Sequence, residues 1–84
     1  MAHFAEIKNG SVGQVLVISN EDCGGGDFPA SEPIGQAFIA SLGIPGIWLQ
    51  TSYNNNFRGM YASGCMYDAD RDVFYRVIPD ISNG

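Results

Sequence analysis

Three alternating aspartates are the residues of this chain whose spacing points most directly to a chemistry. Asp68, Asp70 and Asp72 match the first three ligand positions of a calcium-binding loop. The match ends there, because Val73 stands where that loop needs glycine and Pro79 where it needs a bidentate glutamate. We therefore interpret the three carboxylates as part of a hairpin turn, and we predict no metal ion and no other cofactor.

The cysteines and the single histidine do not form a recognisable catalytic or zinc-binding motif. Cys23 and Cys65 lie far apart without CxxC spacing, and a structural zinc site needs four ligands. We expect two separate reduced thiols or small core residues, with a disulfide or a reactive thiol as the alternative. His3 is expected to be exposed near the start of the chain. No catalytic residue is assigned, and the chain is not expected to be an enzyme.

Residues 48–62 form an aromatic and amide-rich segment that contains the candidate ligand or interface residues. An exposed Trp48 would stack on a sugar ring or anchor an interface, whereas a buried one would close the end of a small barrel; the packing role is favoured. We expect Arg58 to pair with a carboxylate such as Asp68 or Asp70. The candidates for contact with a glycan, a peptide or another protein are Trp48, Tyr53, Asn54, Asn55 and Arg58.

The start of the chain predicts a β-hairpin that would support this segment. Residues 3–7 and 12–18 alternate or are apolar, and Asn9-Gly10 between them is a strong signal for a type I′ turn. Residues 15–18 are apolar in succession, which is typical of a central strand that is covered on both faces.

A glycine-rich acidic loop over residues 21–30 is expected next, followed by a helix. A phosphate-binding loop is the alternative, but the loop has no Lys-Ser/Thr pair and carries carboxylates that would repel a phosphate. Ser31 is predicted to cap the helix, and Gly43 with Pro45 to end it. The stripe predicted to face the sheet, with binding to a partner as the alternative, comprises Ile34, Ala37, Phe38, Ser41 and Leu42.

Three further strands are expected over residues 46–53, 60–67 and 73–78, with a bend at Gly64 and a frayed tail over residues 80–84. In the first of them, the side that carries Trp48 and Gln50 differs from the more apolar side that carries Leu49. The sequence thus predicts a single β-rich α+β domain over residues 1–84. It would be a five-stranded antiparallel sheet or partly open barrel, with one helix between the second and third strands.

Composition restricts the classes of partner. Nine acidic and four basic side chains give a net charge of −5, which argues against nucleic-acid binding. No apolar run is long enough to cross a membrane, and no membrane contact is expected. A core built from 84 residues seldom supplies more than about 3–5 kcal/mol, so self-assembly would help to stabilise the fold. We predict a homo-oligomer or a complex with another protein.

Much of the chain resembles a family of short uncharacterised proteins of tailed bacteriophages, which are abundant in marine viral sequences. The matching blocks are residues 1–7, Trp48 with residues 50–54, Phe57-Arg58, Tyr61-Ala62, Gly64, residues 67–69, Asp72 and Phe74. The resemblance implies a phage origin, in the cytoplasm of an infected bacterium or in the virion, and no established activity. The favoured hypothesis is a non-catalytic structural or assembly component that acts through protein–protein association. The alternative is a small binding module for a glycan or peptide.

Overall fold

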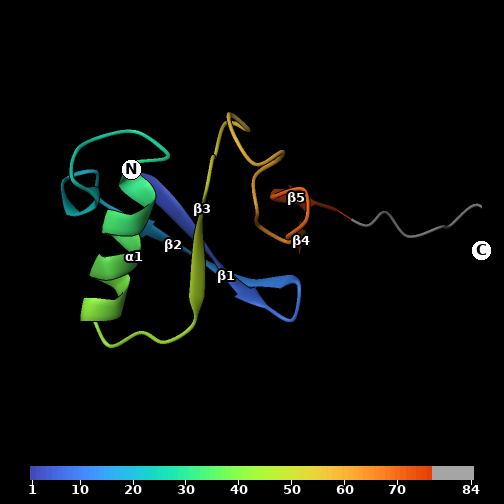
Figure 1. Ribbon diagram of the computed structural model, residues 1–84, viewed down its shortest axis with the longest axis horizontal. Coiled ribbons are helices and arrows are strands. Elements are labelled where there is room, and N and C mark those ends of the chain that lie inside the picture. Colours follow the sequence, from blue (N-terminus) through green and yellow to red (C-terminus); the bar gives the residue numbers. More distant parts are fainter. Residues whose placement is uncertain (77–84) are drawn as a thin grey trace, which may run out of the picture.

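The computed structural model describes residues 1–76 and contains one curled, half-barrel sheet with a helix against it (Figure 1). All adjacent strands pair antiparallel, in the order β3-β1-β2-β4-β5. The strands are β1 Ala2–Lys8, β2 Ser11–Ile18, β3 Ile47–Thr51, β4 Met66–Asp68 and β5 Val73–Tyr75. Between β2 and β3 lie a 3-10 turn, η1, at Glu21–Cys23 and the helix α1 at Ser31–Ser41. The predicted fold class, with the helix between the second and third strands, is confirmed.

The hairpin between β1 and β2 forms around the turn that the sequence predicted. Asn9 and Gly10 have φ angles of 52° and 78°, and a type I′ turn needs positive φ at both central positions. The register is regular except for a bulge that places two residues of β2 opposite Glu6 of β1. The hairpin prediction is therefore confirmed.

Strand β1 is the one most completely covered on both faces. Phe4 and Ala5 point to opposite faces of β1, and both are 0% exposed. In β2, Leu16 and Ile18 pack on the helix face and Val15 packs on the loop face. Val17, however, is 51% exposed. The prediction that residues 15–18 are covered on both faces is therefore confirmed for three of these residues and wrong for Val17.

Two small apolar clusters hold the sheet, one on each face. The helix face carries Phe4 and Trp48 of the sheet, and α1 covers it with Ile39 while η1 adds Cys23. The loop face carries Ala5 and Leu49, and the chain after β3 covers it. The residues that cover the loop face are Met60, Ala62, Cys65, Tyr67 and Phe74. Both cysteines are free and buried, as predicted.

The helix buries a different stripe from the one predicted. Ser31, Gly35 and Ile39 are buried at a spacing of four residues, and Phe38 packs against them in a half-buried position. Ile34 and Leu42 remain 47% and 56% exposed. A pattern based on large apolar residues could not include Gly35. Its lack of a side chain lets the helix backbone lie against the Phe4 ring.

The start of α1 also differs from the prediction, whereas its end agrees. Ser31 makes no capping bond; its hydroxyl donates instead to Oε1 of Gln50 at 2.8 Å, in the buried layer between the helix and β3. The Ser31 hydroxyl thus bonds to a distant strand and does not cap its own helix. Gly43 follows the helix with a φ of 77°, and its N–H donates to the carbonyl of Ala40, which ends the helix as predicted.

The last two strands are shorter than predicted. Residues 60–65 form a loop, in which Gly64 has a φ of 73° and a turn closes from the Cys65 N–H to the Ala62 carbonyl. The sharp bend at Gly64 is therefore present, but it lies before β4 and not within it. The predicted fifth strand begins at Val73, while its residues 77 and 78 and the predicted frayed tail lie outside the described residues. Among residues 1–76, no helix is long and apolar enough to span a membrane.

The close approach of α1 to β1 gives a test of the helix orientation. Replacing Gly35 with alanine should improve the local helix propensity by about 1 kcal/mol. The new Cβ would overlap the Phe4 ring and lie 3.1 Å from Sγ of Cys23. We expect the clash to prevail and Gly35→Ala to lower the free energy of unfolding by roughly 1–3 kcal/mol, measured by urea denaturation followed by Trp48 fluorescence.

A matched control is the opposite exchange on the exposed side of the same helix. Ala37→Gly should also destabilise the protein, by about 1 kcal/mol, because alanine is the better helix former where there is space. A Gly35→Ala variant that is more stable than the wild type would contradict the described packing of α1 on β1.

Candidate functional site

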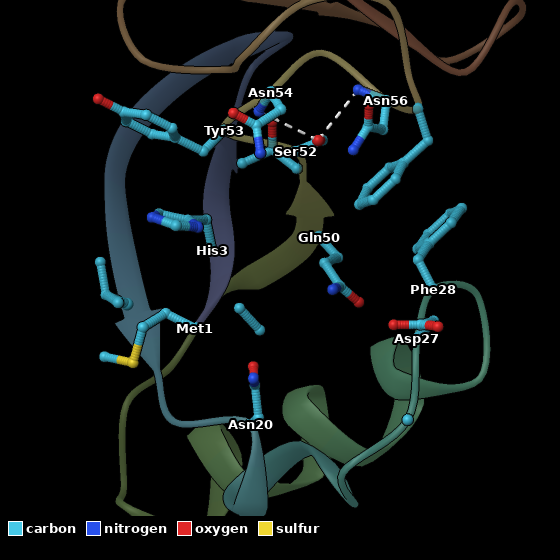
Figure 2. Close-up of a pocket in the computed structure, with 15 residues that line it drawn as sticks. Met1, His3, Asn20, Asp27, Phe28, Gln50, Ser52, Tyr53, Asn54 and Asn56 are labelled. Carbon is cyan, nitrogen blue, oxygen red and sulfur yellow. Dashed lines mark hydrogen bonds between the residues drawn. The ribbon is translucent and has the colours of Figure 1, made fainter.

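An open cleft of about 920 Å³ lies at one end of the sheet (Figure 2). Antiparallel neighbours run in opposite directions, so the start of β1 and the ends of β2 and β3 meet at this end. Residues 26–28, from the loop before α1, and residues 52–57, from the loop after β3, complete its walls. The site thus draws on four segments that are distant in the sequence.

Aromatic side chains form two pairs in the cleft. The rings of His3 and Tyr53 stack with centroids 5.6 Å apart and an interplanar angle of 27°. Phe28 and Phe57 stack more closely, at 3.9 Å and 6°. Figure 2 shows His3 and Tyr53 on one side of the cleft and Phe28 on the other. Tyr53 is 67% exposed, so its ring remains available to a ligand.

The polar lining consists mainly of neutral amides. The amide side chains are those of Asn20, Gln50, Asn54 and Asn56. The hydroxyl oxygen of Ser52 accepts the backbone N–H groups of Asn54 and Asn56, at 3.2 and 3.0 Å, and so shapes the loop that carries them. Because an amide carries both donors and acceptors, this lining can bond to groups of either kind.

The cleft carries no cationic side chain among its lining residues. Asp27 is its one carboxylate, Met1 brings the positively charged amino terminus to the lining, and the remaining lining residues are neutral or histidine. Burial, and then the positive charge of the amino terminus, lower the pKa of His3 below its ordinary value of 6.5. The lowered pKa favours the neutral imidazole, in which one nitrogen donates and the other accepts. Apart from the amino terminus, the lining has no cationic group that would favour an anionic ligand.

Arg58 lies outside the cleft lining and joins four segments. Its guanidinium pairs with Glu32 of α1 and donates from Nε to Oδ1 of Asp72 at 2.8 Å. It also donates to the carbonyl of Gln50 at 3.0 Å and lies 5.0 Å from the ring centroid of Phe28. With its side chain 10% exposed, Arg58 is a structural residue. The predicted pairing with a carboxylate is confirmed, but the partners are Glu32 and Asp72 and not the suggested Asp68 or Asp70.

The hairpin between β4 and β5 supplies the second carboxylate of this ion-pair network. Burial alone would raise the pKa of Asp72, but the hydrogen bond from Tyr67 and the pairing with Arg58 hold it below its ordinary value. Burial and the same hydrogen bond raise the pKa of Tyr67 to about 12. The neighbouring Asp68 instead accepts the backbone N–H of Asp70 within the turn. Among residues 1–76, no group of three or more His, Cys, Asp or Glu side chains is placed to hold a metal ion.

The structure separates the five residues predicted to contact a ligand or partner. Tyr53 and Asn54 line the cleft, whereas Asn55 has a φ of 60° and accepts the N–H of Tyr61, so it stabilises the loop. Trp48 is 4% exposed on the helix face, and its indole donates to the Pro45 carbonyl at 3.2 Å. The packing role favoured for Trp48 is confirmed. Its burial excludes stacking on a surface ligand.

Several cleft residues had no signal in their own sequence context. Asp27 and Phe28 lie in the loop expected to be a glycine-rich surface segment, and His3 was expected only to be exposed near the terminus. The predicted hairpin placed His3 near the end of β2. Its contact with Tyr53 depends on the pairing of β1 with β3, in which His3 lies opposite Thr51. No hydrophobic periodicity in the sequence indicates the pairing of β1 with β3.

The network around Arg58 predicts a specific dependence on pH. The pKa of Asp72 is lowered in the folded state, so its stabilisation is present above the ordinary value of 3.8 and is lost as the pH falls through the folded value. Because the Asp72 side chain is 53% exposed, we expect Asp72→Asn to cost only about 0.2–1 kcal/mol at pH 7. This cost should shrink below about pH 4, as urea denaturation at several pH values would show.

Asp70→Asn provides the control, because Asp70 is an exposed carboxylate of the same turn that makes no ion pair within residues 1–76. We expect that variant to unfold within about 0.5 kcal/mol of the wild type. Equal costs of Asp72→Asn at neutral and acidic pH would show that the ion pair does not stabilise the fold.

Comparisons of the whole chain with protein-family models, with curated proteins and with solved structures found no match. They leave the resemblance to tailed-bacteriophage proteins as a prediction from the sequence. The cleft and the exposed edge of the sheet are therefore the two surfaces that bear on function.

Proposed function

We propose that the chain is a small binding module and that its cleft holds a neutral saccharide. The observation that supports this proposal is the combination of the exposed Tyr53 ring and half-buried aromatic rings with amide side chains, and the absence of a cationic side chain from the lining. Ligand sites commonly combine apolar walls with a few polar groups that set the orientation of the ligand. The cleft has both components.

The two components fit the two kinds of surface on a sugar ring. The C–H groups on one face of the ring are apolar and can pack against a flat aromatic side chain such as Tyr53. The hydroxyl groups at the edge both donate and accept, which matches the amides of Asn54, Asn56 and Gln50. The carboxylate of Asp27 would accept from a hydroxyl and repel a phosphate or carboxylate on the ligand.

A saccharide fits this site better than an extended peptide. A peptide commonly binds by adding a strand to a sheet edge, where it needs free backbone groups. Beside the cleft, the Gln50 N–H donates to Oε2 of Glu32 at 2.8 Å, and the Gln50 carbonyl accepts from Arg58. Because these side chains occupy the outer edge of β3, a peptide cannot add a strand on that side of the cleft; within residues 1–76, the free edge lies on β2 at the opposite side.

The proposal can be tested by applying the protein to an array of neutral glycans and titrating the best binder by calorimetry. Tyr53→Ala should weaken binding roughly two- to tenfold, because aromatic stacking contributes about 0.5–1.5 kcal/mol. Since Tyr53 is 67% exposed, the variant should remain folded. The fluorescence of buried Trp48 reports this independently of the ligand.

Tyr75→Ala is the matched control, since Tyr75 is a 39% exposed tyrosine that does not line the cleft. It should bind the same glycan as tightly as the wild type. The absence of any binder on the array, or equal binding by folded Tyr53→Ala, would refute the proposal. A preference for anionic glycans would contradict the argument from charge.

A second candidate function is that of a phage structural or assembly component that acts through protein–protein association. It is supported by the outer edge of β2, because no strand within residues 1–76 pairs with residues 13–18 on that side. The resemblance noted from the sequence is consistent with such a role. A protein that sediments only as a monomer at micromolar concentration and is absent from purified virions by mass spectrometry would contradict this candidate.

A further inference from the structure

Most of the outer edge of β2 offers backbone groups without a partner. Among residues 1–76, the one strand pairing on that side joins Ser11 to Met66, supplemented by a bond from the Val12 N–H to the Cys65 carbonyl. Residues 13–18 make no further backbone or side-chain bond there. An exposed edge of this kind is a template for another strand.

The other two edges of the sheet are occupied by residues of the same chain. On β3, the Gln36 side chain donates to the Trp48 carbonyl at 2.6 Å, and Glu32 and Arg58 bond to the backbone of Gln50. On β5, the Phe74 N–H donates to the Arg58 carbonyl at 2.9 Å, and Gly59 forms a bridge to Phe74. Within the described part of the chain, β2 is thus the one strand with a stretch of unpaired backbone groups along its outer edge.

We propose that a second copy of this chain pairs antiparallel with residues 15–18 of β2 and forms a two-fold symmetric dimer in solution. The proposal rests on the association candidate described above and names its partner and its interface. A two-fold interface uses the same surface on both copies. Because residues 1–76 of each copy offer one free edge, the pairing closes at two copies and does not continue into a fibre.

The composition of β2 suits pairing with itself. Ser11–Ile18 contains no charged residue and no proline, the residues that commonly protect an exposed edge. Two copies of a chain with a net charge of −5 repel each other overall, so an uncharged contact strand is where that repulsion is smallest. An acidic or basic peptide would find no complementary charge on this strand.

The side chains are also complementary in an antiparallel pairing centred on Leu16. This register places Val17 of one copy opposite Val15 of the other, and β-branched pairs of this kind stabilise sheets. It would cover Val17, which is 51% exposed in the single chain. In this register Ile18 of one copy faces Gln14 of the other, which belongs to the bulge between Val12 and Val15, so residues 15–17 form the regular part of the pairing.

Analytical ultracentrifugation of the wild type and of Val17→Lys tests the interface. The wild type should sediment as a dimer at tens of micromolar, and the dimer should dissociate on dilution. Val17→Lys brings two like charges to the contact, so the dissociation constant should rise at least about tenfold. Ile47→Lys is the control, because Ile47 is a 64% exposed apolar residue on β3 and its replacement should leave the dimer intact.

Val17 also borders the cleft, so hydrogen exchange supplies a readout that does not depend on the substitution. Amides of residues 15–18 in the wild type should exchange at least tenfold more slowly at high than at low protein concentration. A monomer at all concentrations would overturn the dimer, and the association candidate would fall with it only if the protein were also absent from purified virions. A dimer unaffected by Val17→Lys, without added protection of residues 15–18, would overturn this interface alone. Growth into larger species would overturn the closed two-fold geometry.

Discussion

The Arg58 guanidinium is the contact on which the arrangement of the loops depends. It pairs with Glu32 at the start of α1 and with Asp72 before β5, and it donates to the Gln50 carbonyl on β3. Removing one partner from a buried ion pair typically costs about 3–5 kcal/mol. That is comparable with what the whole core of a domain this small commonly supplies, about 3–5 kcal/mol. Arginine suits the role because its planar fork can bond to several acceptors at once, which a lysine ammonium does less well.

This ion-pair network compensates for a core that is divided in two. The sheet has apolar contacts on both faces, but each cluster contains few large side chains, so neither half of the core is large. The helix face depends on α1 and η1, while the loop face depends on a segment with little regular structure. Because Glu32 belongs to the first covering element and Asp72 to the second, Arg58 connects the two halves.

The cleft follows from the same construction. The loop before α1 and the loop after β3 face each other across the end of the sheet, and the stacked rings of Phe28 and Phe57 join them. The guanidinium of Arg58 lies 5.0 Å from the centroid of the Phe28 ring and is held by carboxylates on its other sides. The Arg58 guanidinium is therefore paired within the protein and is not available to a ligand in the cleft. This leaves a lining of amides and aromatic rings for a ligand.

Features that depend on a few neighbouring residues could be predicted from the sequence. Asn9-Gly10 predicted the hairpin because positive φ is a local requirement, and Gly43 marked the end of the helix for the same reason. The order of strands and helix along the chain also followed from local patterns. The length of β4 did not, because its short pairing with β5 and its one contact with β2 depend on how the covering segment folds back.

Contacts between side chains of distant segments could be identified only in the folded chain. The partners of Arg58 include Glu32, 26 positions away, and no periodicity relates the two residues. The face of β3 that carries Trp48 and Gln50 is buried because Ser31 and Gln36 satisfy its polar groups, whereas the side that seemed more apolar leaves Ile47 exposed. Hydrophobic patterns identify which residues can be buried. The bonding of polar groups between distant segments determines which face is buried, and that requires the folded chain.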